Sequence, residues 1–255
     1  SPCSDSMAGR EISGAPAPRD ASTRPTPVIA SPPMTPVRPF TVALFLALAT
    51  AAAGTTLATP AEASVSVAVP YEMLFEAAET IIVAHPVETR SQWEDGRIAT
   101  YTKLHVDEGV AGSEATGSDV WVKTMGGTVG DIGQYVDGEP EFAVGSSNLL
   151  FLKRLSSGPF VVVTRAQGQF LLEVDAATRK TMTKPSPSVG ALVHPSQAPR
   201  ALPAFLAKLQ AKSPAVTDPQ ILFASVRLAK DALPGRALDG LRGELQSAFK
   251  AAHTK

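Results

Sequence analysis

The chain has 255 residues, 44% of them hydrophobic, and its 23 Lys and Arg nearly balance its 24 Asp and Glu. Because it has no excess of positive charge, it lacks the electrostatic signature of nucleic-acid binding, and we expect no nucleic-acid partner. The length allows one or two domains with a packed core.

The first 63 residues have the composition of a targeting region. Residues 1–33 are rich in proline and show no apolar period, so we expect them to be disordered. After Met34 comes one positive charge and then a chargeless apolar run of about fourteen residues, shorter than the roughly 20 that span a bilayer. The tripeptide Ala-Glu-Ala at 61–63 has the small-x-small pattern of a signal-peptidase site. We predict a signal peptide at 34–63, cleaved after Ala63, and no stable membrane span after cleavage.

A signal peptide begins near its initiator, so Met34 is the predicted true start and residues 1–33 lie upstream of it. Cys3, the only cysteine, falls in that upstream segment. We therefore expect an exported protein, periplasmic or extracellular, whose cysteine-free mature chain has no disulfide and no thiolate nucleophile.

The mature chain is predicted to open with short elements. Residues 64–69 alternate Ser with Val or Ala, which suits a first strand or an extended tail. Pro70 is typical of the first turn of a helix, and the apolar stripe that includes Met73, Leu74 and Ala77 predicts a short helix after it.

From residue 80 to 184 the apolar residues follow the two-residue period of β-strands. Pro86 indicates an edge or a bulge in the first strand, and Asp95 with Gly96 predicts a hairpin turn. Strands at regular spacing, separated by turn residues, are typical of a small barrel or sandwich, which we place at residues 64–184. The predicted strands cover 80–93, 98–106, 119–125, 147–155, 159–166 and 170–175.

The composition changes again after the last strand. Residues 185–200 are rich in Pro and Ser and are predicted to be a surface loop or linker. Residues 201–255 are predicted to be helical, and the apolar stripes of their helices indicate packing surfaces. The predicted helices are 201–212, 217–233 with Asp218 as N-cap, and 238–252. The sequence leaves open whether these helices pack on the strands or form a separate unit.

The glycine-rich stretch at 125–145 raises the question of a ligand site. No Lys or Arg occurs between Lys123 and Lys153, and neither phosphate-loop nor dinucleotide glycine spacing is present, so nucleotide binding is not indicated. Four carboxylates supply oxygen ligands of the kind calcium prefers, although their spacing fits no EF-hand. They are Asp131, Asp137, Glu139 and Glu141. We expect the glycines to be structural, at turns and corners that need positive φ.

Catalytic motifs are not found. The 4 histidines include no His-Glu-x-x-His pair, and no Gly-x-Ser-x-Gly elbow occurs, so we assign no catalytic residue and no cofactor. Strand alternation predicts that His105 faces solvent beside Tyr101 and Lys103. The alternative to a non-catalytic protein is a secreted hydrolase, in which carboxylates of the acidic loop 131–141 act as acid and base.

Exposed aromatic residues on a barrel face can form a platform for a ligand or a protein partner. Trp121 would lie outside if Val120 and Val122 face the core, but the two-residue period alone does not decide which face is buried. The predicted ligand or partner surface consists of Trp93, Tyr101, Trp121 and Tyr135.

Residues 72–175 resemble an exported bacterial β-domain family that has no assigned activity. The family pattern has Ser-x-Trp, Gly-Gly, Gly-x-Pro-x-Phe-x-x-Gly, a Leu-Phe-Leu strand and Gln-Gly-x-Phe. The matching positions are Ser91, Trp93, Gly126, Gly127, Gly138, Pro140, Phe142, Gly145, Leu150–Leu152, Gln167, Gly168 and Phe170. The chain departs from the pattern at Met125, where Pro is expected, at Ser146, where Glu is expected, and at His85-Pro86, where glycine is usual.

More distantly, the strand order is similar to netrin-like domains, the oligomer-binding-type barrels of tissue inhibitors of metalloproteinases, which depend on disulfides that this chain lacks. The resemblance implies a mainly β fold with flanking helices, α+β, around a small mixed β-barrel of oligomer-binding or netrin-like type. It implies an exported, non-catalytic binding module with a protein partner, such as a protease.

Overall fold

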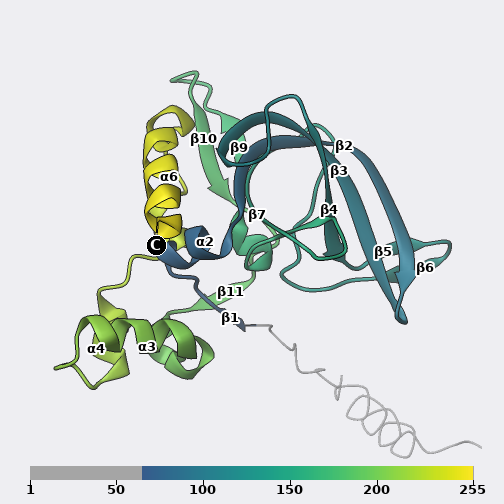
Figure 1. Ribbon diagram of the computed structural model, residues 1–255. Helices are drawn as coiled ribbons and strands as arrows, with labels where there is room; N and C mark the ends of the chain where they lie inside the picture. Colours follow the sequence, from purple (N-terminus) through teal and green to yellow (C-terminus); the bar gives the residue numbers. More distant parts are fainter. Residues whose placement is uncertain (1–64, 255) are drawn as a thin grey trace, which may run out of the picture. The chain divides into compact units, whose positions relative to one another are not determined.

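A computed structural model of the protein describes residues 65–254 (Figure 1). The predictions for residues 1–33, for Cys3 and for the signal peptide at 34–63 lie outside the described residues. The fold is mainly β, with one large sheet and several helices. The strands are β1 Val65–Val67, β2 Thr80–Glu94, β3 Arg97–Gly112, β4 Asp119–Met125, β5 Gly127–Val129, β6 Ile132–Gln134, β7 Ser147–Arg154, β8 Phe160–Val162, β9 Gln169–Val174, β10 Thr181–Pro185 and β11 Ala191–Val193. The helices are α2 Tyr71–Ala77, α3 Pro203–Lys212, α4 Pro219–Ala224, α5 Ala229–Ala232 and α6 Leu238–His253, with 3₁₀ turns at Arg165–Gly168, Pro195–Gln197 and Pro199–Ala201.

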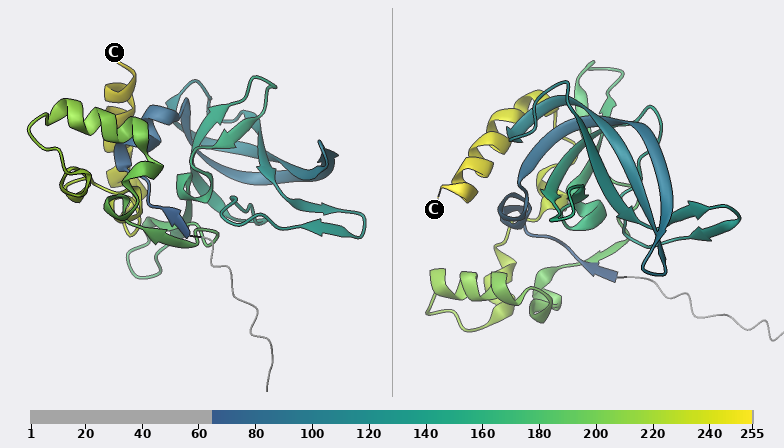
Figure 2. Two further views of the ribbon diagram at one scale, coloured as in Figure 1. Left: turned by 90° about the horizontal axis from the view of Figure 1, so that it is seen from below. Right: turned by 45° about the vertical axis from the view of Figure 1, so that its right-hand side comes forward.

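The seven-stranded sheet has the order β10-β9-β7-β2-β3-β4-β8, and β8 also pairs with β7. Strands β7, β2, β3, β4 and β8 therefore follow one another in a closed ring, visible in Figure 1. All neighbours in this ring are antiparallel except β4 and β8, which are parallel through Val122 and Phe160. The hairpin of β5 and β6 extends from the end of the ring that lies away from α2 and α6 (Figure 2).

Two apolar clusters on opposite faces of β2 and β7 form the core. The first fills the ring and includes Ile82 and Leu150. The second lies between the outer faces of these strands and the helices, and it includes Ile81 and Phe151. Because both faces of β2 and β7 are covered, their sequences are continuous apolar runs at this point and do not alternate.

The two longest strands, β2 and β3, form a bent hairpin. Asp95 and Gly96 have φ of 48° and 75°, which is the backbone of a type I′ turn and agrees with the predicted Asp-Gly turn. The register between β2 and β3 shifts between Pro86 and Glu88, so the predicted bulge is confirmed. Pairing of β2 with β7 ends at Ala84, and Pro86, which has no N–H, therefore lies where that edge of β2 is free.

Helices α2 and α6 cover the second core cluster. Tyr71, Leu74 and Phe75 of α2 are buried, as are Leu241 and Leu245 of α6. A bidentate ion pair joins α6 to β3, because the Arg242 guanidinium contacts Glu108 at 2.7 and 2.9 Å. The predicted helices after Pro70 and at 238–252 are thus confirmed, and α6 belongs to the packed core.

The helix predicted at 217–233 is interrupted, which is a correction. Asp218 caps α4 as predicted, since its carboxylate accepts from the N–H of Gln220 at 2.8 Å. The chain then leaves the helical conformation because Leu228 forms a β-bridge with Pro70 before α5 begins. The predicted loop at 185–200 contains β11, which pairs in parallel with β1 and which the proline-rich composition did not predict.

Candidate functional site

A groove lies on the outer face of β3 and β4, beside the turn between β7 and β8. Its volume is about 450 Å³. Trp121 and Tyr101 contribute aromatic rings to it, and Arg90 and Arg154 contribute guanidinium groups. Pro159 and Phe160 form the side next to the turn. Strand alternation positions these side chains, since β3 and β4 turn Thr102 and Val122 toward the interior.

The guanidinium of Arg90 stacks on the aromatic rings of the groove. It lies 4.5 Å from the ring centre of Trp121 and 5.9 Å from that of Tyr101, a cation–π arrangement. On the other side, the Arg154 guanidinium lies 4.0 Å from the ring centre of Phe160 and donates to Glu114 at 2.8 Å. The groove therefore combines aromatic surface with two cations.

Glu94 holds the aromatic and cationic side chains of this face together. Its carboxylate accepts hydrogen bonds from the Lys123 ammonium, from the Tyr101 hydroxyl and from the Gln92 amide. These bonds, the one from Lys123 first, lower the pKa of Glu94 from 4.5 to about 2. The hydrogen bond with Glu94 also raises the pKa of Tyr101, because the phenol donates its proton to a carboxylate.

The predicted partner surface is divided between two faces of the sheet. Val120 and Val122 are buried, so Trp121 lies on the outer face together with Tyr101, which answers the question that the sequence left open. Trp93 is 50% exposed, but it pairs with Ile98 and lies on the opposite face of the β2–β3 hairpin. Tyr135, which is 75% exposed, lies beyond the ring in the glycine-rich stretch.

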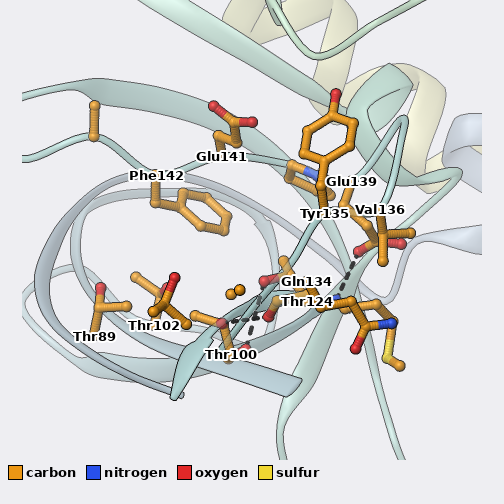
Figure 3. Close-up of a pocket in the computed structure, with 17 residues that line it drawn as sticks. Thr89, Thr100, Thr102, Thr124, Gln134, Tyr135, Val136, Glu139, Glu141 and Phe142 are labelled. Atoms are coloured by element: carbon orange, nitrogen blue, oxygen red, sulfur yellow. Dashed lines mark hydrogen bonds between the residues drawn. The ribbon is translucent and has the colours of Figure 1, made fainter. Parts of the chain in front are cut away.

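A second cavity, of about 600 Å³, lies at the mouth of the ring under the glycine-rich stretch (Figure 3). Its floor is formed by threonines, and the ring of Phe142 points into it above Thr102, whereas that of Tyr135 points away. Labelled residues around it are Thr89, Thr100, Thr102, Thr124, Gln134, Tyr135, Val136, Glu139, Glu141 and Phe142. The glycines have the expected turn conformations, with φ of 91° at Gly126 and 73° at Gly138. Gly126, Gly127 and Gly133 also line the cavity, a role that the sequence did not indicate.

The acidic residues of this stretch are not gathered into one site. Among residues 65–254, no three His, Cys, Asp or Glu side chains are arranged to hold a metal ion, and the candidates Asp131, Asp137, Glu139 and Glu141 form no such group. Asp131 is exposed between β5 and β6. Both carboxylate oxygens of Glu139 are occupied, one by the Met125 N–H at 3.1 Å and one by Arg165 at 3.3 Å.

Comparisons with family models, with curated proteins and with solved structures give no match to this chain. In the part of the chain that the structure describes, no helix is both long enough and apolar enough to cross a membrane.

Two of the histidines, His85 and His105, are brought together by the register of β2 and β3, which the sequence alone did not reveal. His105 is partly exposed on the face of Tyr101 and Lys103, as predicted. Its direct cross-strand neighbour is His85. His194 caps a 3₁₀ turn, and His253 lies at the end of α6.

Proposed function

We propose that the protein is a non-catalytic binding module that recognises another protein through the groove on β3 and β4. Trp, Tyr and Arg carry most of the binding energy at protein interfaces, because they combine large contact areas with directional polar groups. Trp121, Tyr101 and Arg90 supply this combination at one place on the sheet. The aromatic rings are held in place before binding, which reduces the entropy lost on association.

The observation that carries the proposal is that the Arg90 guanidinium stacks on an aromatic ring and has no carboxylate partner within residues 65–254. The ring is that of Trp121. Arg154, across the groove, is already paired with Glu114. A guanidinium that is oriented by stacking and has free donors is suited to a carboxylate from outside. We infer that the partner presents an Asp, a Glu or a chain terminus to Arg90, next to an apolar side chain that packs on Trp121.

We further propose that the ring is a small barrel of the oligomer-binding or netrin-like type. The order β7-β2-β3-β4 is that of a Greek key, in which the fourth strand returns to lie beside the first. A fifth strand, β8, bridges β4 and β7, and a five-stranded Greek-key barrel is the oligomer-binding architecture. In that architecture one sheet face and the adjoining loops bind ligands, which supports a partner on the β3–β4 face.

We propose an exported location, periplasmic or extracellular, and an exported partner, such as a protease. The support is the signal-peptide pattern at 34–63 and the similarity to inhibitor barrels. The hydrolase alternative lacks a comparable argument. An acid–base pair needs two available carboxylates that face one substrate, but Glu139 is engaged in hydrogen bonds and Glu141 points away from the cavity floor.

The test is retention of an exported protein by the immobilised chain, compared among three variants. Trp121→Ala and Arg90→Gln remove the groove contacts and should weaken binding about 30-fold or more, as expected for central interface residues. Trp93→Ala is the matched control, because it removes the same type of side chain from the opposite face of the same sheet. Retention that depends on Trp93 and not on Trp121 would contradict the proposed surface, and retention that none of the three changes would contradict the proposed groove.

A further inference from the structure

His85 and His105 form a cross-strand pair on the outer face of the sheet. They are directly opposite in the β2–β3 register, and their ring centres are 5.4 Å apart with an angle of 52° between the planes. Their side chains are 41% and 39% exposed, so both imidazoles are accessible from solvent. The pair lies at a fixed separation because the hydrogen bonds of two long strands hold it.

Each imidazole is oriented by its own aspartate. The Nδ1 of His85 lies 2.9 and 3.0 Å from the two carboxylate oxygens of Asp107. The Nδ1 of His105 lies 2.9 Å from the Asp119 carboxylate. An ionised carboxylate only accepts hydrogen bonds, so Nδ1 carries the proton in both rings. In the neutral form of each ring, the lone pair is therefore on Nε2.

We propose that His85 and His105 together bind one divalent transition-metal ion through their Nε2 atoms. Carboxylates on Nδ1 are the usual outer partners of metal-binding histidines, where they fix the tautomer and increase the basicity of the ligand nitrogen. Imidazole favours late first-row ions such as Zn²⁺ and Cu²⁺ over Mg²⁺ or Ca²⁺. No third side chain of His, Cys, Asp or Glu completes the site among the described residues, so water fills the other positions.

The charges around the pair favour a cation. Asp107 and Asp119 each contribute a negative charge, and Glu88 lies on the neighbouring position of β2. Among residues 65–254, the cation that borders the pair in the strand register is Lys103, which is 2.9 Å from Asp119 and opposite Glu88. Three carboxylates against one ammonium leave the surroundings of the imidazoles negative.

The chain contains its own control in His253. Its Nδ1 donates to the carbonyl of Phe249 at 2.9 Å, so it presents a free Nε2 in the same tautomer. It has no second histidine beside it among the described residues. Comparison of this residue with the pair separates chelation by two imidazoles from binding to any exposed histidine.

The test is a titration of the full chain with Zn²⁺, followed by the side-chain ¹⁵N resonances of the histidines. Cys3→Ser is present in every protein, so that the thiol does not compete for the ion. The metal-free spectrum should show Nδ1 protonated in His85 and His105. Added Zn²⁺ should then shift both Nε2 resonances together, at a concentration at least about tenfold below that which affects His253, because the second imidazole acts intramolecularly.

Two further variants make the proposal falsifiable. His85→Gln should raise the Zn²⁺ concentration needed at His105 at least about tenfold, whereas His253→Gln should leave the pair unchanged. Asp119→Asn should weaken binding about 10- to 100-fold by removing the orienting carboxylate. The proposal is overturned if His85 and His105 respond independently of each other, or only at the concentration that affects His253.

Discussion

The hydroxyl of Tyr101 donates a hydrogen bond to the carboxylate of Glu94 across the β2–β3 hairpin, and Lys123 of β4 contacts the same carboxylate. One acidic side chain therefore connects three strands on the face that carries the groove. The arrangement also fixes the ring of Tyr101 next to Arg90, since the phenol cannot rotate away without losing its acceptor.

The first prediction concerns the pH dependence of this contact. The pKa of Glu94 is about 2 in the folded protein against an ordinary value of 4.5. A lowered folded-state pKa means that the carboxylate stabilises the fold above pH 4.5, and that this contribution is lost as the pH falls from about 4.5 toward 2. The ¹³C resonance of the Glu94 carboxyl should titrate near pH 2. In Lys123→Met its midpoint should move up toward the ordinary value, and an unchanged midpoint would contradict the assigned cause.

The second prediction concerns the buried hydrogen bonds around Gln169, at the start of β9. The Gln169 side chain donates to Asn148 at 3.0 Å and to the Glu141 carbonyl at 2.7 Å, and it accepts from Ser186 at 2.8 Å. Gln169→Leu leaves these partners without their bonds, each worth about 1–3 kcal/mol when buried. We expect a loss of about 3 kcal/mol in the free energy of unfolding by denaturant titration. Gln210→Leu on exposed α3 is the control and should change stability by less than about 0.5 kcal/mol.

Local patterns predicted much of the fold because they depend on neighbours in the sequence. The alternation in β3, the proline bulge in β2 and the Asp-Gly turn are all decided within a few residues. The short strands β10 and β11 were not predicted as separate elements, because tertiary pairing with β9 and β1 stabilises them more than their own composition does. The break between α4 and α5 has the same origin, in the bridge between Leu228 and Pro70.

The candidate sites were less predictable than the strands. Tyr101 and Trp121 could be named as aromatic candidates, but their contact with Arg90 depends on the register of three strands. The sequence places His85 and His105 on different strands, and only the pairing of β2 with β3 brings their rings together. Counting the pairs outward from the turn at Asp95 and Gly96 would match His85 with Val106. The bulge at Pro86 shifts the register by one residue, so that His85 is opposite His105.

The third prediction compares two glycines with positive φ. Gly112 has φ of 95°, and a Cβ there would lie 2.5 Å from the Glu79 carbonyl oxygen and 2.6 Å from the Thr80 Cα. Gly117 has φ of 85° with nothing within 4 Å of its Cβ position. Both alanine variants incur the left-handed strain of about 1–2 kcal/mol, but only Gly112→Ala adds a clash with backbone. We expect thermal or denaturant unfolding to show Gly112→Ala about 1–3 kcal/mol less stable than Gly117→Ala. Equal losses of stability in the two variants would contradict the close approach of Gly112 to the backbone of Glu79 and Thr80.

The last prediction concerns Phe142, which anchors the glycine-rich stretch over the mouth of the ring. Its side chain packs against the apolar cluster inside the ring, whereas Val144, two residues further on, is 96% exposed. Gly138 and Gly145, with φ of 73° and 81°, are the turns on either side. Phe142 is the residue of this segment that packs against the apolar cluster, and polar contacts of Glu139 and of the Glu141 carbonyl also hold the segment. Because these contacts are few, we expect the segment to open locally while the strands of the ring remain paired.

Phe142→Ala removes the apolar contact and should lower the free energy of local opening by about 1–2 kcal/mol, since the phenyl side chain is only partly buried. Amide exchange and proteolysis between residues 126 and 146 should then become roughly tenfold faster, with little change in the exchange of β2 and β7. Val144→Ala is the matched control and should change neither rate. If Phe142→Ala instead accelerates exchange throughout β2 and β7, the segment is part of the global folding unit, because its loss then destabilises the ring itself.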